Sequence, residues 1–377
     1  MLAARYDKAT GACQSLEAHA RQVAARCATA CEPLGLQKLG YLAGLLHDAG
    51  KAGQPFQDYL FERNGPAARD SVNHSSCGAR YVWEHLSDRS ASGRLAADLM
   101  AAAMSGHHSG LPDCLTPGGA DGLHQRLYPE RDAGVEAALA AFFTCGVTEA
   151  ETEALFPQVE AEVAALHTRL QDIAAVAPEG QRRRMTAALL GMAARFLVSC
   201  LLDADRCDAR VWAAGPLPEA QADWGTWAAR LEQRLAGFDP RPPVNRIRME
   251  IADACRAAIG RGPGVYQLYV PTGGGKTLSS LRFALGTAAA GGARRVLYVA
   301  PYKTILEQNA GDIRAILGDG PAILEHHSDY LPPEGAEALE RYEWATERWD
   351  APLILTTAVQ FLNTLFLGKN AAARRMA

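Results

Sequence analysis

Two metal-binding side chains stand next to each other in the segment GLLHDAGK, where His47 and Asp48 follow two leucines. Imidazole nitrogens and carboxylate oxygens both bind divalent cations, and one carboxylate can bridge two of them. A single His-Asp pair is usually an ordinary polar pair, because short motifs have many false positives without confirming context. The pair therefore indicates metal chemistry only if further ligands accompany it.

Further candidate ligands occur throughout the first half of the chain. A two-metal site in a helical bundle needs several neutral imidazoles and at least one carboxylate, drawn from helices that face one interior. The chain supplies these in the segments SLEAHARQVA, LLHDAGK, SVNHSSCGA, SGHHSGL and LLDADRCDA. The candidates are His19, His47, Asp48, His74, His107, His108 and Asp205. Asp203 competes with Asp205, because the helix expected over 185–202 is apolar all round and its periodicity cannot separate the two.

In the order H…HD…H…HH…D, these residues resemble the HD phosphohydrolase superfamily in its nuclease form. The resemblance implies two metal ions that share Asp48. It gives the first ion to His19, His47, Asp48 and Asp205, and the second to Asp48, His74, His107 and His108. The "AD" pairing of that family favours Asp205 over Asp203. Three other histidines lack a partner in the motif and are expected at surface or packing positions: His85, His124 and His167.

The expected ligands also predict a mechanism. Two cations that share Asp48 can lower the pKa of a bound water to near neutrality and can clamp the attacking and leaving phosphate oxygens. Lys51, one turn beyond Asp48, is placed to balance charge on the scissile phosphate; a solvated structural lysine is the alternative. Asp48 and Lys51 are thus the candidate catalytic residues. Imidazole-rich ligation favours Mn, Fe, Co or Ni over Mg, which prefers oxygen ligands.

A second chemical motif, YVPTGGGKTLSSLRFAL, begins at Tyr269. In a phosphate-binding loop, glycines let backbone N–H groups face the phosphates, the lysine reaches the β- and γ-phosphates, and the threonine hydroxyl binds magnesium. The expected ATP-binding residues are Thr272, Gly273, Gly274, Gly275, Lys276 and Thr277. Val270 replaces the first glycine of G-x-x-x-x-G-K-[ST]. The form PTGGGKT resembles the loop of superfamily 1 and 2 helicases.

Two later segments resemble further helicase motifs. VLYVAPYKTILEQNAGDI, 296–313, resembles motif Ia, and LILTTAVQFLNTLF, 353–366, resembles motif Ib with its Thr-Thr pair. The acidic motif D-E-x-[HQ] does not occur after Thr357. ATP hydrolysis and translocation need that motif and a second RecA-like lobe. We therefore expect this chain to be an N-terminal fragment of a longer protein, and we expect the fragment to bind ATP weakly and not to turn it over.

The elements that must position these residues differ between the two halves of the chain. From Ser15 to about Ala209, apolar residues recur at three- and four-residue intervals, which predicts an all-α bundle. Beyond Pro243, the runs GVYQLYVP and RRVLYVAP alternate with helical segments, which predicts a parallel α/β sheet. The expected multi-domain order is an HD-type nuclease domain over 1–212, a Pro-rich linker over 213–243, and a partial first RecA-like helicase lobe over 244–377.

Composition limits the cellular setting. No apolar run reaches the ~20 residues that span a bilayer, and the N-terminus lacks a signal-peptide core, so we expect a cytoplasmic protein without a membrane partner. The nine cysteines include no C-x-x-C pair and read as reduced thiols. A net charge of −4 means that nucleic acid must be bound in local grooves, for which Lys51 and Arg182 to Arg184 are candidates.

Together the two halves resemble the CRISPR-associated helicase-nucleases of type I systems. The resemblance implies a metal-dependent endonuclease or exonuclease for single-stranded DNA, coupled to ATP-driven 3′-to-5′ translocation. It also implies recruitment by the Cascade surveillance complex, with its crRNA, to the displaced strand of an R-loop. Two alternatives are an HD-type phosphohydrolase of free nucleotides and a non-catalytic recruitment module with a vestigial metal site.

Overall fold

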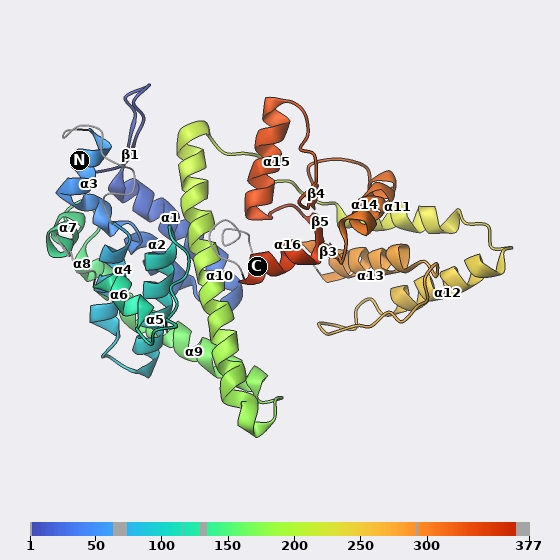
Figure 1. Ribbon diagram of the computed structural model, residues 1–377, viewed down its shortest axis with the longest axis horizontal. Helices are drawn as coiled ribbons and strands as arrows, with labels where there is room; N and C mark the ends of the chain where they lie inside the picture. Colours follow the sequence, from blue (N-terminus) through green and yellow to red (C-terminus); the bar gives the residue numbers. More distant parts are fainter. Residues whose placement is uncertain (1, 63–73, 115, 129–133, 292, 367–377) are drawn as a thin grey trace. The chain divides into compact units, whose positions relative to one another are not determined.

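The structure is a computed structural model, which describes residues 2–62, 74–114, 116–128, 134–291 and 293–366. It divides between Pro216 and Leu217 into two compact units, each with its own core. The first unit is helical and the second contains a small parallel sheet, as the sequence predicts (Figure 1). The end of the expected helicase lobe, 367–377, lies outside the described residues.

The first unit opens with a short antiparallel hairpin, β1 (Ala3–Tyr6) and β2 (Cys13–Ser15). Helices then follow one another around a single apolar core. They are α1 (Leu16–Cys31), α2 (Gln37–Leu46), α3 (Gln54–Leu60), α4 (Ser76–Leu86), α5 (Ala91–Gly106), α6 (Gly122–Leu127), α7 (Val135–Phe142), α8 (Glu149–Glu153), α9 (Phe156–Ala174) and α10 (Glu179–Ala214).

Glycines allow two helices of the first unit to pack with their backbones in close approach. A Cβ on Gly44 of α2 would lie 2.7 Å from the Cα of Ala24 on α1, and one on Gly40 would lie 2.8 Å from the Cys31 sulfur. Real Cβ atoms do not approach backbone atoms so closely, so only glycine fits at Gly44 without a shift. This contact sets the distance between the helices that carry His19 and His47.

Helix α10 is long and apolar enough to cross a membrane, judged by length and composition alone. A core helix meets the same criterion, and the described packing is that of a core helix. Its central residues, from Phe196 to Ala204, are buried, and it packs against α1, α5 and α9. One face of it carries Asp205 and Asp208 toward the histidines of the unit.

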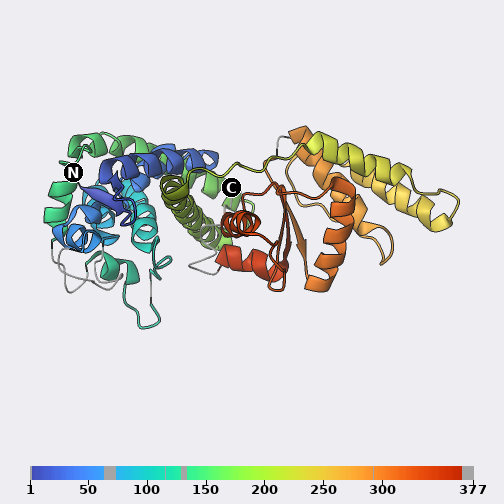
Figure 2. The ribbon, with the colours of Figure 1, turned by 90° about the horizontal axis from the view of Figure 1, so that it is seen from above.

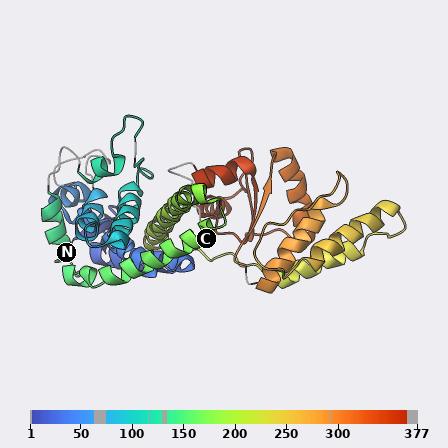
Figure 3. The ribbon, with the colours of Figure 1, turned by 90° about the horizontal axis from the view of Figure 1, so that it is seen from below.

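The second unit is built on three parallel strands in the order β3-β5-β4: β3 (Val296–Ala300), β4 (Ile323–His326) and β5 (Leu353–Thr357). Its helices are α11 (Trp224–Ala236), α12 (Pro243–Ala257), α13 (Lys276–Gly291), α14 (Lys303–Leu317), α15 (Ala336–Arg348) and α16 (Ala358–Phe366). Leu353 and Leu355 pack with α13 and α14, whereas Ile354 packs with α15 and α16. Figures 2 and 3 show these helix pairs on opposite sides of the strands.

Two segments differ from their expected structure or setting. The run GVYQLYVP is not a strand, and Val265 and Tyr269 are fully exposed. A strand is stable only beside a hydrogen-bonding neighbour, and in the described part of the second unit the strand pairs are β3 with β5 and β4 with β5. Helix α11 lies inside the segment expected as a linker, yet Trp227 and Leu231 are buried in the second core. The domain limits themselves stay a prediction.

Candidate metal centre

The structure brings the seven candidate ligands together from five parts of the first unit. Their ligand atoms form two groups, and within each group all atoms lie within 4.8 Å of one another. One group is His19, His47, Asp48 and Asp205; the other is Asp48, His74, His107 and His108. These are the two ligand sets that the family resemblance implies. Asp48 belongs to both, as a bridging carboxylate would.

Two of the histidines are positioned in the same way, each at the C-terminal end of a helix. His47 follows α2 and places its Nδ1 2.8 Å from the carbonyl oxygen of Gly44. His107 follows α5 and places its Nδ1 2.5 Å from the carbonyl oxygen of Met104. These carbonyls have no amide partner within the helix, so each accepts an N–H from the ring. Both Nε2 atoms are therefore left as lone pairs that face the site.

The turn after His47 depends on a glycine. A Cβ on Gly50 would lie 2.4 Å from the carbonyl oxygen of His74 and 2.7 Å from its Cα. The backbone of His74 therefore lies directly against the turn Ala49–Ala52, and no larger side chain fits between them. This explains why the His-Asp pair is followed by Ala-Gly: the small residue lets a distant histidine reach the site.

The two oxygens of Asp48 face different histidines. Oδ2 lies 3.0 Å from His19 Nε2 and 3.2 Å from His47 Nε2. Oδ1 lies 3.5 Å from His107 Nε2 and 3.7 Å from His74 Nε2. Each oxygen is thus directed at one group, which is the arrangement needed to hold two cations with one carboxylate.

Several buried atoms of the centre lack hydrogen-bond partners. Among the described residues these include His47 Nε2, His107 Nε2 and Asp48 Oδ1. An unsatisfied buried polar atom costs about 1–3 kcal/mol, and three of them facing one space are a large cost. Metal coordination would satisfy all three, because each atom offers a lone pair. The residues therefore fit a pair of divalent cations.

The electrostatics of the centre also suit cations. Partial burial, followed by the charge of His107, lowers the pKa of His108 to about 3, so its ring is neutral and can bind metal. Burial raises the pKa of Asp48, but the charges of His47 and Lys51 and the hydrogen bonds around it outweigh this and lower the pKa. Burial lowers the pKa of His19, but the hydrogen bonds to Asp208 and Asp48 outweigh burial, so the net pKa is raised. The carboxylates that favour a proton on His19 equally favour a metal cation there.

The geometry separates the two candidates for the last ligand. Asp205 Oδ1 lies 3.7 Å from His19 Nε2 and 3.9 Å from His47 Nε2. Asp203, two residues earlier on α10, is buried and contacts the sulfur of Cys207. Among the described residues it belongs to neither group. The arrangement supports Asp205 as the ligand, although the assignment stays a prediction.

Lys51 is buried, unlike the solvated lysine that was the alternative. Only 10% of its side chain is exposed, and its Nζ lies 2.6 Å from Asp48 Oδ2. The ammonium also lies 5.6 Å from the centre of the Phe56 ring. A buried lysine next to a carboxylate contributes positive charge inside the centre, where water screens it poorly.

The remaining histidines and the arginine run lie away from the centre. His124 is exposed and its ring lies against that of Tyr128, while the Nδ1 N–H of His85 donates to the Tyr81 carbonyl. Both they and His167 fall outside the two groups of described ligands. Arg182 to Arg184 begin the same continuous helix as Asp205. At 1.5 Å per residue they lie roughly 30–35 Å from it along the helix, and their expected role in a nucleic-acid groove stays a prediction.

The sequence did not single out three residues that lie behind the ligands: Asp208 and Arg5 contact ligands directly, and Gln14 contacts Asp208. Asp208 accepts from His19, and Arg5 and Gln14 both donate to Asp208. Asp208 could have been noticed, because it follows Asp205 by three positions on a helix and must share its face. Arg5 and Gln14 carry no motif and come from the N-terminal hairpin, so only the fold places them there.

The phosphate loop runs into α13 with Thr272, Gly273 and Lys276 exposed, while Gly274 is buried. Gly273 and Gly275 have φ of +82° and +81°, which favour glycine, and Lys276 is the exposed first residue of the helix. The Thr277 hydroxyl donates to Asn309 at 3.2 Å, and Asn309 donates to the Tyr298 hydroxyl at 3.0 Å. The loop is thus tied to β3 and α14, which carry the segment resembling motif Ia.

Comparison with known families and structures follows the same division. The family described as "Cas3, HD domain" matches residues 7–195, which end before Asp205, and the family described as "Type III restriction enzyme, res subunit" matches residues 243–360. No curated protein matches the chain.

Three solved structures of one protein resemble the chain: T. fusca Cas3-ADP, Cas3-AMPPNP and Cas3. Each is 18% identical to it and is matched over 99% of this chain and 45% of the other, with TM-scores of 0.52, 0.47 and 0.49 respectively. At this identity, the likeness to the ADP form shows a shared fold. The chain spans less than half the length of these structures.

Proposed function

From the premise that the chain belongs to the Cas3 HD-domain family, joined here to a helicase-like unit, we propose that it is a metal-dependent nuclease that cleaves single-stranded DNA. The observation that carries the proposal is the placement of Asp48, whose two oxygens face two separate histidine groups. A bridging carboxylate of this kind suits phosphodiester hydrolysis, in which two metal ions activate water and stabilise the phosphate oxygens.

The residues of the chain divide the work between them. His19, His47, Asp48 and Asp205 would hold one ion, and Asp48, His74, His107 and His108 would hold the other. The carbonyls of Gly44 and Met104 fix the rings of His47 and His107, so that little reorganisation is needed when the ions bind. Lys51 supplies a positive charge beside Asp48, where it balances negative charge that gathers on the scissile phosphate.

The substrate enters beside His74 and His108 in this proposal. His108 is exposed and His74 is partly exposed, whereas His19, His47 and His107 are buried. A single strand can be drawn past such an opening with its bases turned outward, while a stiff duplex cannot reach buried ligands. The five imidazole rings and two carboxylates of the set favour Mn, Fe, Co or Ni at both positions.

The second unit supports a role in ATP-dependent movement of DNA. Thr272 to Thr277 would bind the phosphates of ATP with magnesium, as the positive φ angles and the exposed Lys276 permit. In the longer protein, this would drive 3′-to-5′ translocation. Recruitment by Cascade to the displaced strand of a crRNA R-loop, in the cytoplasm, completes the proposal and is drawn from the family alone.

Two other functions are less well supported. A phosphohydrolase of free nucleotides does not account for the helicase-like unit that follows the metal centre. A vestigial centre does not account for seven ligands that remain gathered with three buried atoms unsatisfied. Both alternatives make distinct predictions in the experiment below.

The test compares substrates at one manganese concentration. We expect cleavage of a single-stranded oligonucleotide to exceed that of a blunt duplex of the same sequence by at least about tenfold, because the duplex cannot approach the buried ligands. Free dNTPs are the control substrate. Equal rates on duplex would refute the single-strand assignment, preferential hydrolysis of dNTPs would establish the phosphohydrolase, and protein that binds no metal would indicate a vestigial centre.

A further inference from the structure

A buried carboxylate lies behind His19, on the side opposite the metal ligands. His19 Nε2 faces Asp48 at 3.0 Å, while its Nδ1 lies 2.7 Å from Asp208 Oδ2. The two nitrogens lie on opposite edges of the ring, and Asp208 belongs to neither group of candidate ligands. Neither the His19 nor the Asp208 side chain is exposed.

Asp208 is itself held by two residues of the N-terminal hairpin. Its Oδ2 accepts from Arg5 Nη1 at 2.6 Å and from Gln14 Nε2 at 2.9 Å. Arg5 also donates to Gln14 Oε1 at 2.8 Å, which closes a small network. Hydrogen bonds between charged groups in a buried setting are short and strong. The carboxylate is therefore fixed in position before any metal binds.

Arg5 extends this network to a second candidate ligand. Its Nη2 donates to Asp205 Oδ1 at 2.7 Å, while its Nη1 is bonded to Asp208. Asp205 and Asp208 are three residues apart on α10 and would repel each other as bare carboxylates. The planar guanidinium, with two donors in fixed geometry, holds both. One arginine thus connects the residue behind His19 with the ligand next to His19.

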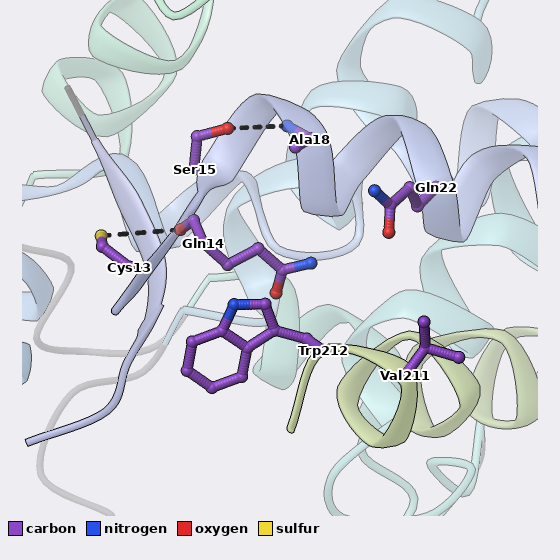
Figure 4. Close-up of a pocket in the computed structure, with 7 residues that line it drawn as sticks. All are labelled: Cys13, Gln14, Ser15, Ala18, Gln22, Val211 and Trp212. Atoms are coloured by element: carbon purple, nitrogen blue, oxygen red, sulfur yellow. Dashed lines mark hydrogen bonds between the residues drawn. The ribbon is translucent and has the colours of Figure 1, made fainter. Parts of the chain in front are cut away.

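The network borders an open pocket at Gln14. Gln14 lines an open pocket of about 410 Å³ with Cys13, Ser15 and Trp212, and Figure 4 shows its amide above the indole ring. Asp208 and His19 lie deeper and are not among the lining residues. Gln14 is 6% exposed and donates to Asp208, so it lies between this pocket and the buried carboxylate.

We propose that Asp208, held by Arg5 and Gln14, is a positioning residue that keeps a proton on His19 Nδ1 and so presents Nε2 to the first metal ion. The inference rests on the proposed metal-dependent function. The competing arrangement has His19 Nδ1 as an acceptor from Arg5 Nη1, which lies 3.2 Å away. In that arrangement His19 Nδ1 and Asp208 Oδ2 would be two acceptors 2.7 Å apart, and two lone pairs at this distance repel each other.

Loss of Asp208 should weaken binding of the first metal ion and not of the second. Carboxylates that accept from metal-bound histidines fix the ring and raise its basicity, and their loss typically weakens metal binding 10- to 100-fold. Because Asp208 touches only His19 among the ligands, the ion held by His74, His107 and His108 should be unaffected. Arg5 should also act on the first ion, through both Asp208 and Asp205.

The experiment titrates metal-free protein with Co²⁺ and follows both binding steps by calorimetry and visible absorption. Asp208→Ala should weaken one step 10- to 100-fold and leave the other unchanged, and Asp208→Asn should weaken the same step less because its amide oxygen still accepts. In a His108→Ala background, Asp208→Ala should weaken the first ion's step. The matched control is Tyr81→Phe, which removes a buried hydrogen bond to Thr152 away from the centre and should change neither step.

A second readout reports the proton itself. In ¹⁵N NMR of protein loaded with diamagnetic Zn²⁺, His19 should carry its proton on Nδ1, with the signal identified from its loss in His19→Gln. Asp208→Ala should make that proton exchange faster with water. If Asp208→Ala does not fold, as judged by thermal unfolding, Asp208→Asn carries both measurements.

The possible outcomes separate this inference from the proposed function. Wild-type protein that binds no metal would refute both. Wild-type protein that binds two ions and cuts DNA, with Asp208 variants of unchanged affinity and unchanged Nδ1 signal, would overturn only the role of Asp208. Equal weakening of both binding steps would also overturn it, since that result indicates a general structural effect.

Discussion

The metal centre of the first unit and the phosphate loop of the second are constructed in opposite ways. The centre collects side chains from five separate parts of the chain, buries most of them and holds several from behind with hydrogen bonds. The loop is one continuous and mostly exposed segment, and its expected contacts to phosphate are made mainly by backbone. The first is made by packing and the second by local sequence, so a substitution should act very differently in each.

Asp48→Ala should have the largest effect and tests whether the centre is a single unit. Removing the shared carboxylate leaves both ions short of a ligand, and metal-activated water supplies several kcal/mol of catalysis. Cleavage of single-stranded DNA should fall by at least about 10³-fold, and bound metal, measured by elemental analysis, should fall with it. Two tightly bound ions and normal cleavage in this variant would mean that Asp48 does not bridge.

His108→Ala should have an intermediate effect, confined to the second ion. His108 is the most exposed of the seven candidate ligands, so its removal should disturb the fold little while the ion loses one of four ligands. Cleavage should fall roughly 100-fold.

The matched control for that change is His124→Ala. His124 is also an exposed histidine of the first unit, but it contacts Tyr128 and lies in neither ligand group. Its removal should change the rate by no more than about twofold. If both variants lost activity equally, the division of histidines into ligands and non-ligands would be wrong.

The same contrast explains what could be predicted from the sequence. The order of histidines and aspartates indicated seven candidate positions in short distinctive segments, and the structure gathers their ligand atoms into two groups. That they bind metal stays a prediction. The contacts behind the ligands could not be predicted. Arg5 and Gln14 belong to a hairpin before the first helix, and nothing in its residues indicates that it folds against α10.

The fold shows a similar limit. Helical periodicity predicted the first unit well, because each amphipathic helix carries its own pattern. It failed for GVYQLYVP, which has strand composition but is not a strand among the described residues. Strand formation depends on a neighbour, and a neighbour is a property of the whole sheet. The expected linker also contains α11, whose apolar face, with Trp227 and Leu235, belongs to the second core. The sequence does not show which partner such a face packs against.

Lys276→Ala should have the smallest effect on cleavage and completes the comparison. Every proposed ligand lies in the first unit, before residue 206, whereas Lys276 is an exposed residue at the start of α13 in the second. The ion-bound water needs no phosphate-loop group, so cleavage of a short single-stranded oligonucleotide without ATP should stay within about twofold of wild type. The measurement is the initial rate with manganese, beside Asp48→Ala as the inactive reference.

Binding of an ATP analogue should fall in the Lys276 variant and persist in Asp48→Ala, because the lysine contacts phosphate and the aspartate does not. A loss of cleavage that matches the loss of ATP binding would show that the two regions act as one site, and the contrast between a packed centre and a local loop would no longer hold.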